Sequence, residues 1–376
     1  MGRHHAIVLA LVLAAGPGPA SAAEVVIGAQ FPLSGPMASY SGPRLSAGAE
    51  VAVERVNATH MLGDGRTLKL LMEDNAGDKS QAISLTNRFA TIDKVVAMFG
   101  VYGSTLALPV APVANGLKMP FLAIAASPAI SKAGPWSFTL ITSATEDVLI
   151  ARFAAERLHI KSLAIVFDRT NDSSVRIREA IEALMKAANV KIVSADGISP
   201  ADTNFGPLAT RIAGEPIDAL FIESVPPVAA NLFIQIRQAG LDPKVKLLAG
   251  AQVDTPVFTQ IGGAAVDGVY FPSIYRPDFP SAENTAFVAA YHKRANAVPD
   301  PVGAWAYAST MLLARAIHDA GPGADREKVR TALAGLREVP SVLGTGNYSF
   351  DADRVGSFEE VLVRIENGAP KIVTPQ

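Results

Sequence analysis

Residues 95–129, VVAMFGVYGSTLALPVAPVANGLKMPFLAIAASPA, predict two strands that end close together at one edge of a sheet. Segments 95–99 and 119–123 are short apolar runs, typical of strands that are buried on both faces of a parallel sheet. The carboxyl ends of parallel strands meet at one edge, and open α/β sheets bind ligands there. This stretch therefore predicts an α/β fold with a ligand site at that edge.

Small and polar residues follow both predicted strands. Gly103 lets the chain turn after the first strand, and Ser104 or Thr105 is expected to cap the next helix. Ala126 and Ser127 follow the second strand. Hydroxyl and N–H groups beside a helix N-terminus favour an anion, so we expect a small molecule's carboxylate at this edge. The alternative is that these residues are ordinary helix caps.

Strands and helices alternate on both sides of this stretch. Strands are predicted at 24–31 and 67–72, and the alternation restarts after residue 143 with a strand at 162–167. Such alternation indicates right-handed βαβ units around a parallel sheet. After Tyr275, helices follow without strands between them, so we expect them to return and cover the first domain; they are predicted at 282–295, 302–320 and 326–333.

The composition is that of an ordinary globular protein with more than one domain. The chain has 376 residues, which is more than a domain with a single hydrophobic core usually has. It is 49% hydrophobic and 18% charged. A net charge of −2 without a basic run makes nucleic acid an unexpected partner. The absence of cysteine excludes thiol catalysis, cysteine metal sites and a lipid-anchor cysteine.

The first residues resemble a secretory signal. Arg3 precedes an apolar run at 6–15, and Ala20-Ser21-Ala22 supplies small residues before a cleavage site. We therefore expect residues 1–23 to be removed on export, which leaves a soluble periplasmic protein without a lipid anchor.

Motifs that carry enzyme chemistry are missing from the sequence. There is no Walker loop, HExxH, GxSxG or helix-opening GxGxxG, and the histidines are scattered. We therefore predict no enzyme activity, no cofactor and no metal. Gly344-Thr345-Gly346 is expected to form a hairpin turn, and the acidic pairs Glu73-Asp74 and Glu359-Glu360 are expected to be solvated.

The segment 28–58, GAQFPLSGPMASYSGPRLSAGAEVAVERVNA, resembles the opening of periplasmic amino-acid-binding proteins of the leucine/isoleucine/valine type, the receptor subunits of ABC importers. The resemblance continues through 165–172 and 300–305 and covers essentially the whole mature chain. It implies the type I periplasmic-binding-protein fold, in which two Rossmann-like lobes with parallel sheets, joined by a three-segment hinge, close around one ligand. The expected lobes are 24–142 with 275–350, and 143–274 with 351–376.

The resemblance also implies roles for single residues. Ser104 and Ser127 match hydroxyl residues that hold the ligand's α-carboxylate, with the backbone of Ala125 in the same clamp. Tyr40 matches an aromatic beside it, and Trp305 one that contacts the ligand's side chain. The alternative for Trp305 is a core position in its helix. The full set of predicted ligand-binding residues is Tyr40, Tyr102, Ser104, Thr105, Ala125, Ala126, Ser127, Asp172, Ser224, Gln252 and Trp305.

Two positions depart from the family pattern and leave the ligand's class open. Gln252 falls where these receptors place a glutamate for the ligand's ammonium, and Asp172 falls where a tyrosine is usual. Either Asp172 supplies the missing charge, or the ligand lacks an ammonium group and is an aromatic or α-keto acid lying against Tyr40, Tyr102 and Trp305.

The predicted function is capture of a small carboxylate ligand by a monomeric periplasmic receptor, which delivers it to a membrane permease. One alternative is a sensing subunit that signals to a membrane partner. The other is an exported enzyme with an active site between the lobes, which turnover of the ligand would reveal.

Overall fold

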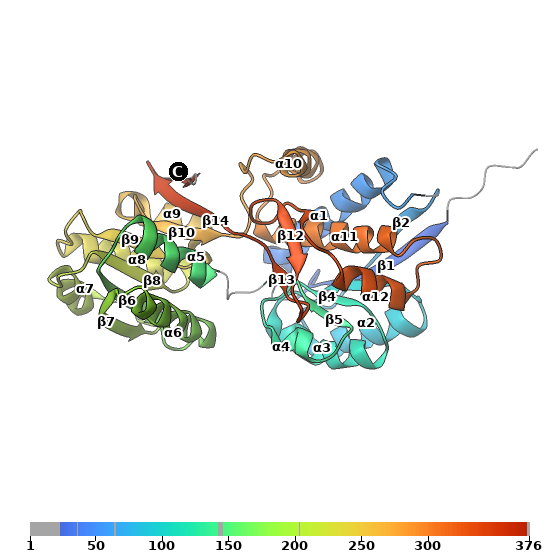
Figure 1. The fold of residues 1–376 in the computed structure, drawn as a ribbon, viewed down its shortest axis with the longest axis horizontal. Coiled ribbons are helices and arrows are strands. Elements are labelled where there is room, and N and C mark those ends of the chain that lie inside the picture. Colours follow the sequence, from blue (N-terminus) through green and yellow to red (C-terminus); the bar gives the residue numbers. More distant parts are fainter. Residues whose placement is uncertain (1–22, 36, 64, 142–145, 203, 374–376) are drawn as a thin grey trace, which may run out of the picture.

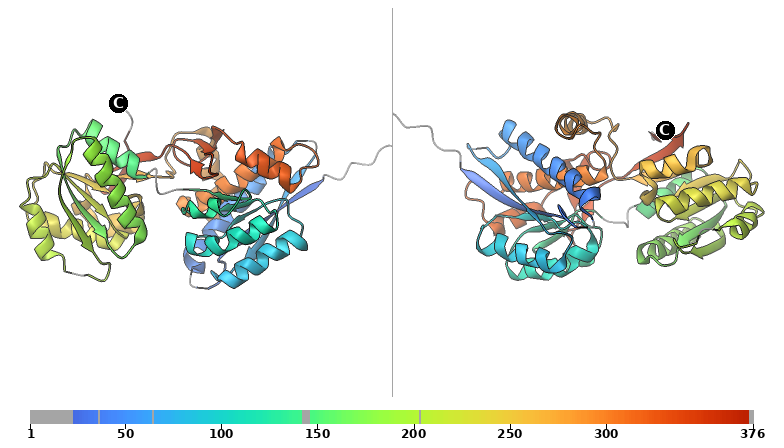
Figure 2. Two further views of the ribbon diagram at one scale, coloured as in Figure 1. Left: turned by 60° about the horizontal axis from the view of Figure 1, so that its bottom comes forward. Right: turned by 180° about the vertical axis from the view of Figure 1, so that it is seen from behind.

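The computed structural model describes residues 23–373 except 36, 64, 142–145 and 203. The side chains of Tyr40, Glu146, Asp147 and Asp172 also lie outside the described part, as does most of the predicted signal. The described residues form two lobes, each built around its own sheet, and the different views show them side by side (Figures 1 and 2).

The first lobe contains a parallel sheet with the strand order β2-β1-β3-β4-β5. Its strands are β1 (Glu24–Phe31), β2 (Thr67–Asp74), β3 (Met98–Gly100), β4 (Phe121–Ala123) and β5 (Ser137–Thr139). The helices between them are α1 (Ala38–Ala58), α2 (Lys79–Thr91), α3 (Ser104–Gly116) and α4 (Ala129–Lys132). Both strands predicted within 95–129 therefore form and lie next to each other.

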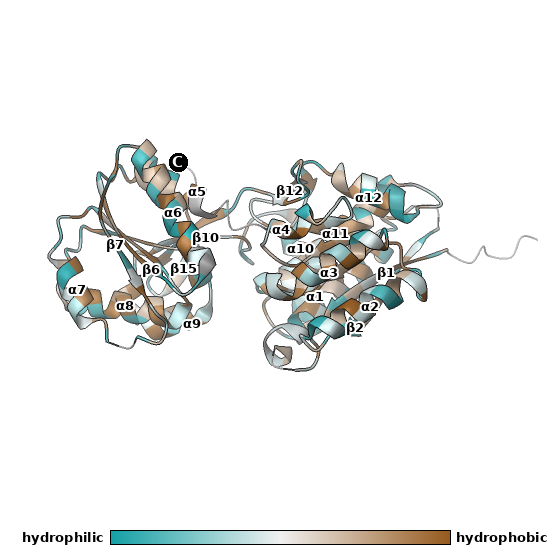
Figure 3. Ribbon diagram, turned by 90° about the horizontal axis from the view of Figure 1, so that it is seen from below, coloured by the Kyte–Doolittle hydropathy of each residue, from teal (hydrophilic) through white to brown (hydrophobic). Residues whose placement is uncertain are grey.

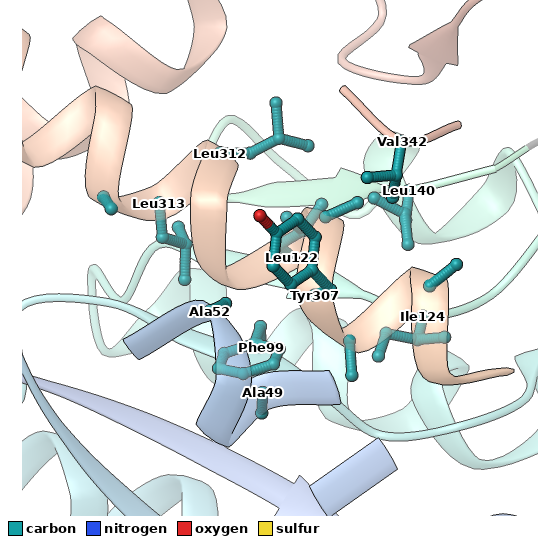
Figure 4. Close-up of a cluster of buried hydrophobic side chains, with 14 of the residues drawn as sticks. Ala49, Ala52, Phe99, Leu122, Ile124, Leu140, Tyr307, Leu312, Leu313 and Val342 are labelled. Atoms are coloured by element: carbon teal, nitrogen blue, oxygen red, sulfur yellow. The ribbon is translucent and has the colours of Figure 1, made fainter. Parts of the chain in front are cut away.

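Helices from late in the sequence complete the first lobe. They are α10 (Ala282–Ala295), α11 (Pro301–Asp319) and α12 (Arg326–Ala334), followed by a small antiparallel sheet of β11 (Val339–Pro340), β12 (Asn347–Phe350) and β13 (Gly356–Ser357). Ala49 and Ala52 of α1 lie beside Phe99 of β3 and Tyr307 of α11 in one buried cluster (Figure 4). The core of this lobe thus joins segments that most of the second lobe, from α5 to β10, separates in sequence.

The second lobe has the strand order β15-β14-β10-β9-β8-β6-β7. Its strands are β6 (Ser162–Asp168), β7 (Lys191–Ile198), β8 (Ala219–Glu223), β9 (Lys246–Ala249), β10 (Tyr270–Ser273), β14 (Val361–Glu366) and β15 (Ala369–Ile372). Its helices are α5 (Glu146–Arg152), α6 (Asp172–Ala187), α7 (Gly206–Ala213), α8 (Pro226–Gln238) and α9 (Pro256–Gly262), with a π-helical turn (Phe153–Arg157) and 3₁₀ turns (Ala251–Val253 and Gly263–Val266). Hydrophobic residues line its central strands, while hydrophilic residues alternate along α6 and α7 (Figure 3).

Along the described residues the chain changes lobe in three places: between β5 and α5, after β10, and between β13 and β14. Strands β5 and β10 both run toward these connections. Because β6, β8 and β9 are parallel to β10, the carboxyl edges of both sheets face the connections and therefore each other. β13 pairs with β12, so the last change of lobe falls after Ser357, beyond the expected boundary at residue 350.

Two of the three connections are joined by a turn of the first lobe. Gly344 N–H donates to the Ile274 carbonyl at 2.8 Å, and Thr345 N–H donates to the Glu359 carbonyl at 2.8 Å. This turn joins the antiparallel strands β11 and β12, which confirms the predicted hairpin at Gly344-Thr345-Gly346. The prediction of solvation is wrong for Glu360, which is 4% exposed because it enters the second lobe beside β14.

Tyr348 contacts two of the connections from inside the first lobe. Its buried hydroxyl donates to the Leu140 carbonyl at 2.7 Å, and its ring stacks on Phe358 with centroids 5.7 Å apart. Replacing Tyr348 by phenylalanine leaves that carbonyl without its donor, so the free energy of unfolding should fall by about 1 kcal/mol. Urea unfolding measures the loss. Tyr270→Phe, whose hydroxyl bonds no described residue, is the control, and equal losses in both variants would contradict this role.

Candidate ligand-binding site

The predicted clamp lies where β3 and β4 end. Ser127 N–H donates to Ser104 Oγ at 3.2 Å, so the two loops are joined at the predicted residues. Thr139 Oγ1 of β5 also donates to the Ser127 carbonyl at 3.4 Å. Ser104 and Ser127 are half-buried, which leaves their hydroxyls partly accessible at the sheet edge. Thr105, the next residue of α3, is exposed.

The first turn of α3 differs from the predicted cap. Gly103 occupies the cap position with a φ of 95°, and no side chain caps the helix. Residues with a side chain rarely adopt this backbone conformation, so a glycine occupies the cap position and Ser104 is the first helical residue. The prediction that Ser104 or Thr105 caps α3 is therefore wrong. The Ser104 hydroxyl is instead engaged with the loop that follows β4.

Backbone donors complete this part of the edge. Ala125 is 4% exposed and Ala126 is half-buried, and their N–H groups donate to no other described residue. The positive end of the α3 dipole lies beside them. Two hydroxyls, N–H groups and a helix N-terminus together form a site that favours a carboxylate.

Aromatic rings border these polar groups. The Tyr102 and Trp305 ring centroids are 6.0 Å apart with an interplanar angle of 31°, so α11 brings Trp305 to the loop after β3. Both side chains pack against the first-lobe core but remain half-buried. The Trp305 Nε1–H is buried and has no hydrogen-bond partner among the described residues. Tyr40 lies in the first turn of α1, and its side chain is outside the described part.

The loop before α1 is anchored by Asp74. Its Oδ1 accepts from the N–H groups of Leu33 at 2.9 Å, Ser34 at 3.1 Å and Ala76 at 2.7 Å. Burial raises the pKa of Asp74, but hydrogen bonds from Ser34, Ala76 and Leu33 outweigh it and hold the pKa below its usual value. Both side chains remain partly exposed, as predicted, and each also has a structural role: Asp74 organises the loop, and Glu73 pairs with an arginine of α2.

This anchor gives a pH dependence. Because the pKa of Asp74 is lowered by folding, its stabilisation is present above the unfolded pKa and is lost as the pH falls through the folded pKa. Asp74→Ala should lower the free energy of unfolding by about 1–2 kcal/mol at pH 7. The difference in melting temperature between variant and wild type should become smaller as the pH is lowered from 5 to 2. A gap that stays constant over this range would contradict the ionised role of Asp74.

The facing edge belongs to the second lobe. β8 ends at Glu223, which is 1% exposed, and is followed by Ser224, also 1% exposed. The Ser224 hydroxyl has no hydrogen-bond partner among the described residues. Gln252 follows β9, and its Nε2 donates to Glu223 Oε1. The predicted Ser224 and Gln252 therefore follow the neighbouring strands β8 and β9. Asp172 begins α6, and its side chain is outside the described part.

Glu223 is the functional candidate that sequence reasoning missed. It ends the strand ALFIE, so an apolar run that closes in a carboxylate was the available signal. A Cβ atom at position 250 would lie 1.5 Å from Glu223 Oε2, so the glycine there leaves the space that the carboxylate occupies.

A buried ion pair ties this edge to the connection after β10. Asp254 follows the 3₁₀ turn that carries Gln252, and it accepts from Ser273 Oγ at 2.5 Å and from Arg276 Nη1 at 3.4 Å. Burial raises the pKa of Asp254, although Arg276 and Ser273 oppose the shift. The position of Gln252 is thus linked to the segment that changes lobe.

No hydrogen bond between described residues joins the first-lobe set to the second-lobe set. The structure describes no group of three histidine, aspartate or glutamate side chains that could hold a metal ion. Among the same residues, every helix is too short or too polar to cross a membrane.

Known proteins resemble this chain along almost its full length. A family model described as periplasmic binding protein matches residues 24–369. The Leu/Ile/Val-binding protein BraC3 of Rhizobium johnstonii is 28% identical over 341 residues, covering 89% of this chain and 90% of the relative. A crystal structure from Rhodospirillum rubrum, described as a putative branched-chain amino acid ABC transporter, is 25% identical with a TM-score of 0.84, covering 93% of this chain and 100% of the other.

The fold also extends to a solute binding protein from Rhodopseudomonas palustris BisB5 in complex with 3,4-dihydroxy benzoic acid. It is 22% identical with a TM-score of 0.72, covering 91% of this chain and 93% of the other. These matches confirm the predicted resemblance and the two-lobed α/β fold. The prediction that the chain is not an enzyme is confirmed by its match to this family.

Proposed function

Because the chain belongs to the periplasmic binding protein family, we propose that it captures a small carboxylate ligand and delivers it to the permease of an ABC importer. The ligand is a branched-chain or other hydrophobic amino acid, or an aromatic or α-keto acid. The hydrogen bond between Ser127 N–H and Ser104 Oγ carries the proposal, because it brings hydroxyls and N–H groups together at one edge.

The lobes close around the ligand in the proposed mechanism. The ligand's carboxylate binds first at Ser104, Ser127 and the N–H groups of Ala125 and Ala126, with its side chain against Tyr102 and Trp305. Closure then adds groups of the second lobe, among them Ser224 and Gln252. Support comes from the carboxyl edges of the two sheets, which face each other across the connections.

The expected binding energy is sufficient for this role. Micromolar affinity requires about −8 kcal/mol. Three or four charge-assisted hydrogen bonds at about 1.5–3 kcal/mol each, with one buried ring, reach that value after ordering costs are subtracted.

The proposal also includes the lobe boundaries, the export signal and the oligomeric state. The predicted lobes, 24–142 with 275–350 and 143–274 with 351–376, are kept except at the last boundary. Because β13 pairs with β12, that boundary moves to a point after Ser357. Residues 1–23 act as the export signal, and the mature protein works as a periplasmic monomer without a lipid anchor.

A thermal-shift screen tests the proposal. The full mature chain is heated with amino acids, α-keto acids and hydroxybenzoates, and a bound ligand raises the melting temperature according to RT ln(1 + [L]/Kd). We expect at least one of these classes to stabilise the protein, with the ligand recovered unchanged. No shift with any of them would contradict the proposed ligand class, and conversion of the ligand would contradict a receptor.

A further inference from the structure

The buried carboxylate of Glu223 lies behind Gln252 at the ligand edge of the second lobe. We infer that Glu223, acting through Gln252, makes this site select ligands with an ammonium group over acids of the same shape that lack one. This inference rests on the proposed function of the site. Glu223 is then a positioning residue, and Gln252 is the group that contacts the ligand.

The second lobe holds the Glu223 carboxylate in a buried position. Removing a carboxylate from water costs several kcal/mol, so a buried one at a strand end calls for a reason. Here the chain provides both room and a donor. Gly250 leaves the space that Glu223 Oε2 fills, where a Cβ atom would lie 1.5 Å away, and Gln252 Nε2 donates to the other oxygen.

The Gln252 amide is oriented by its hydrogen bond to Glu223. An ionised carboxylate only accepts hydrogen bonds, so the NH₂ end of the amide must be the end that faces Glu223. The carbonyl oxygen of Gln252 is left as the acceptor for other groups. Gln252 is half-buried whereas Glu223 is 1% exposed, so the amide is the part of the pair that a ligand reaches. The carboxylate behind it polarises the amide and strengthens that acceptor.

The two facing edges differ in the charged and polar groups that they carry. Asp168 ends β6, the neighbour of β8, and is 3% exposed, so two carboxylates lie at adjacent strand ends of the second lobe. The first lobe offers hydroxyls, N–H groups and the α3 N-terminus instead. A ligand that spans both edges is favoured when one end is an anion and the other a cation. An α-amino acid has this distribution, while an α-keto or aromatic acid has only the anion.

Matched pairs of probes test this selection by calorimetry. The pairs are alanine with pyruvate, leucine with 4-methyl-2-oxopentanoate, and phenylalanine with phenylpyruvate. We expect the wild type to bind at least one amino acid at least tenfold more tightly than its keto partner. Glu223→Gln should remove that preference by weakening the amino acid at least tenfold while the keto acid changes less than threefold.

A charge-swapped variant separates selection from a merely structural role. The double variant Glu223→Gln, Gln252→Glu moves the carboxylate from position 223 to position 252, which contacts the ligand in the proposal. This variant should restore the preference for the amino acid. Equal weakening of both probes by Glu223→Gln, or no recovery in the swapped variant when its melting temperature matches the wild type, would overturn the inference. Wild-type binding of keto acids or 4-hydroxybenzoate without any amino acid would overturn it and keep the proposed function. No binding of any probe would overturn both.

Discussion

Replacing Ser104 and Ser127 together by alanine should raise the dissociation constant of the ligand at least 100-fold. Each hydroxyl can donate to the ligand's carboxylate, and a hydrogen bond to a charged group contributes about 1.5–3 kcal/mol. The Ser104 oxygen accepts from Ser127 N–H, which leaves the Ser104 proton available for the ligand. Isothermal titration with the tightest ligand from the thermal-shift screen measures the loss.

The fold should survive this double substitution. Both serines are half-buried at the sheet edge, and only the one hydrogen bond between them is lost. The free energy of unfolding should therefore fall by only about 1 kcal/mol. Thr210→Ala is a matched control, because it removes a hydroxyl from exposed α7, far from the site in sequence and in the other lobe. Undiminished affinity in the double variant would refute the assignment of the clamp.

Gly48→Val should be the most destabilising of the substitutions considered. α1 crosses α11 at this glycine, and a Cβ atom there would lie 2.1 Å from the Gly303 carbonyl oxygen. Gly303 cannot retreat, since its own Cα packs against the Tyr291 ring, which a Cβ atom would meet at 2.8 Å. Overpacking against backbone should lower the free energy of unfolding by about 3 kcal/mol. Binding should weaken as well, because α11 carries Trp305.

Gly116→Ala is the control for this effect. Gly116 lies in the last turn of α3, and a Cβ atom there would meet nothing within 4 Å. Alanine has the higher helix propensity, so this variant should be neutral or slightly more stable. Urea unfolding of both variants gives the comparison. A Gly48→Val variant with wild-type stability would mean that the two helices do not approach as closely as the structure has them.

The sequence predicted the lobes well because apolar runs and their spacing report directly on buried strands. It also placed Ser104 and Ser127 at one edge, since both follow adjacent parallel strands. The predicted capping residue of α3 was wrong because the helix begins where the backbone conformation of Gly103 allows it, and not where a serine or threonine could cap it. Glu223 was missed for another reason. Its setting depends on Gly250 and Gln252, which follow a different strand, and such a contact has no local pattern.

The turn at Gly344 and Thr345 restricts how the molecule can bend. It binds the backbone of two connecting segments, at Ile274 and Glu359, so those segments cannot slide past each other. Bending between the lobes that keeps these two hydrogen bonds must therefore leave the two segments side by side at this turn. In the proposed closure, the backbone of these two segments would be constrained at Ile274 and Glu359, which are not among the residues proposed to contact the ligand.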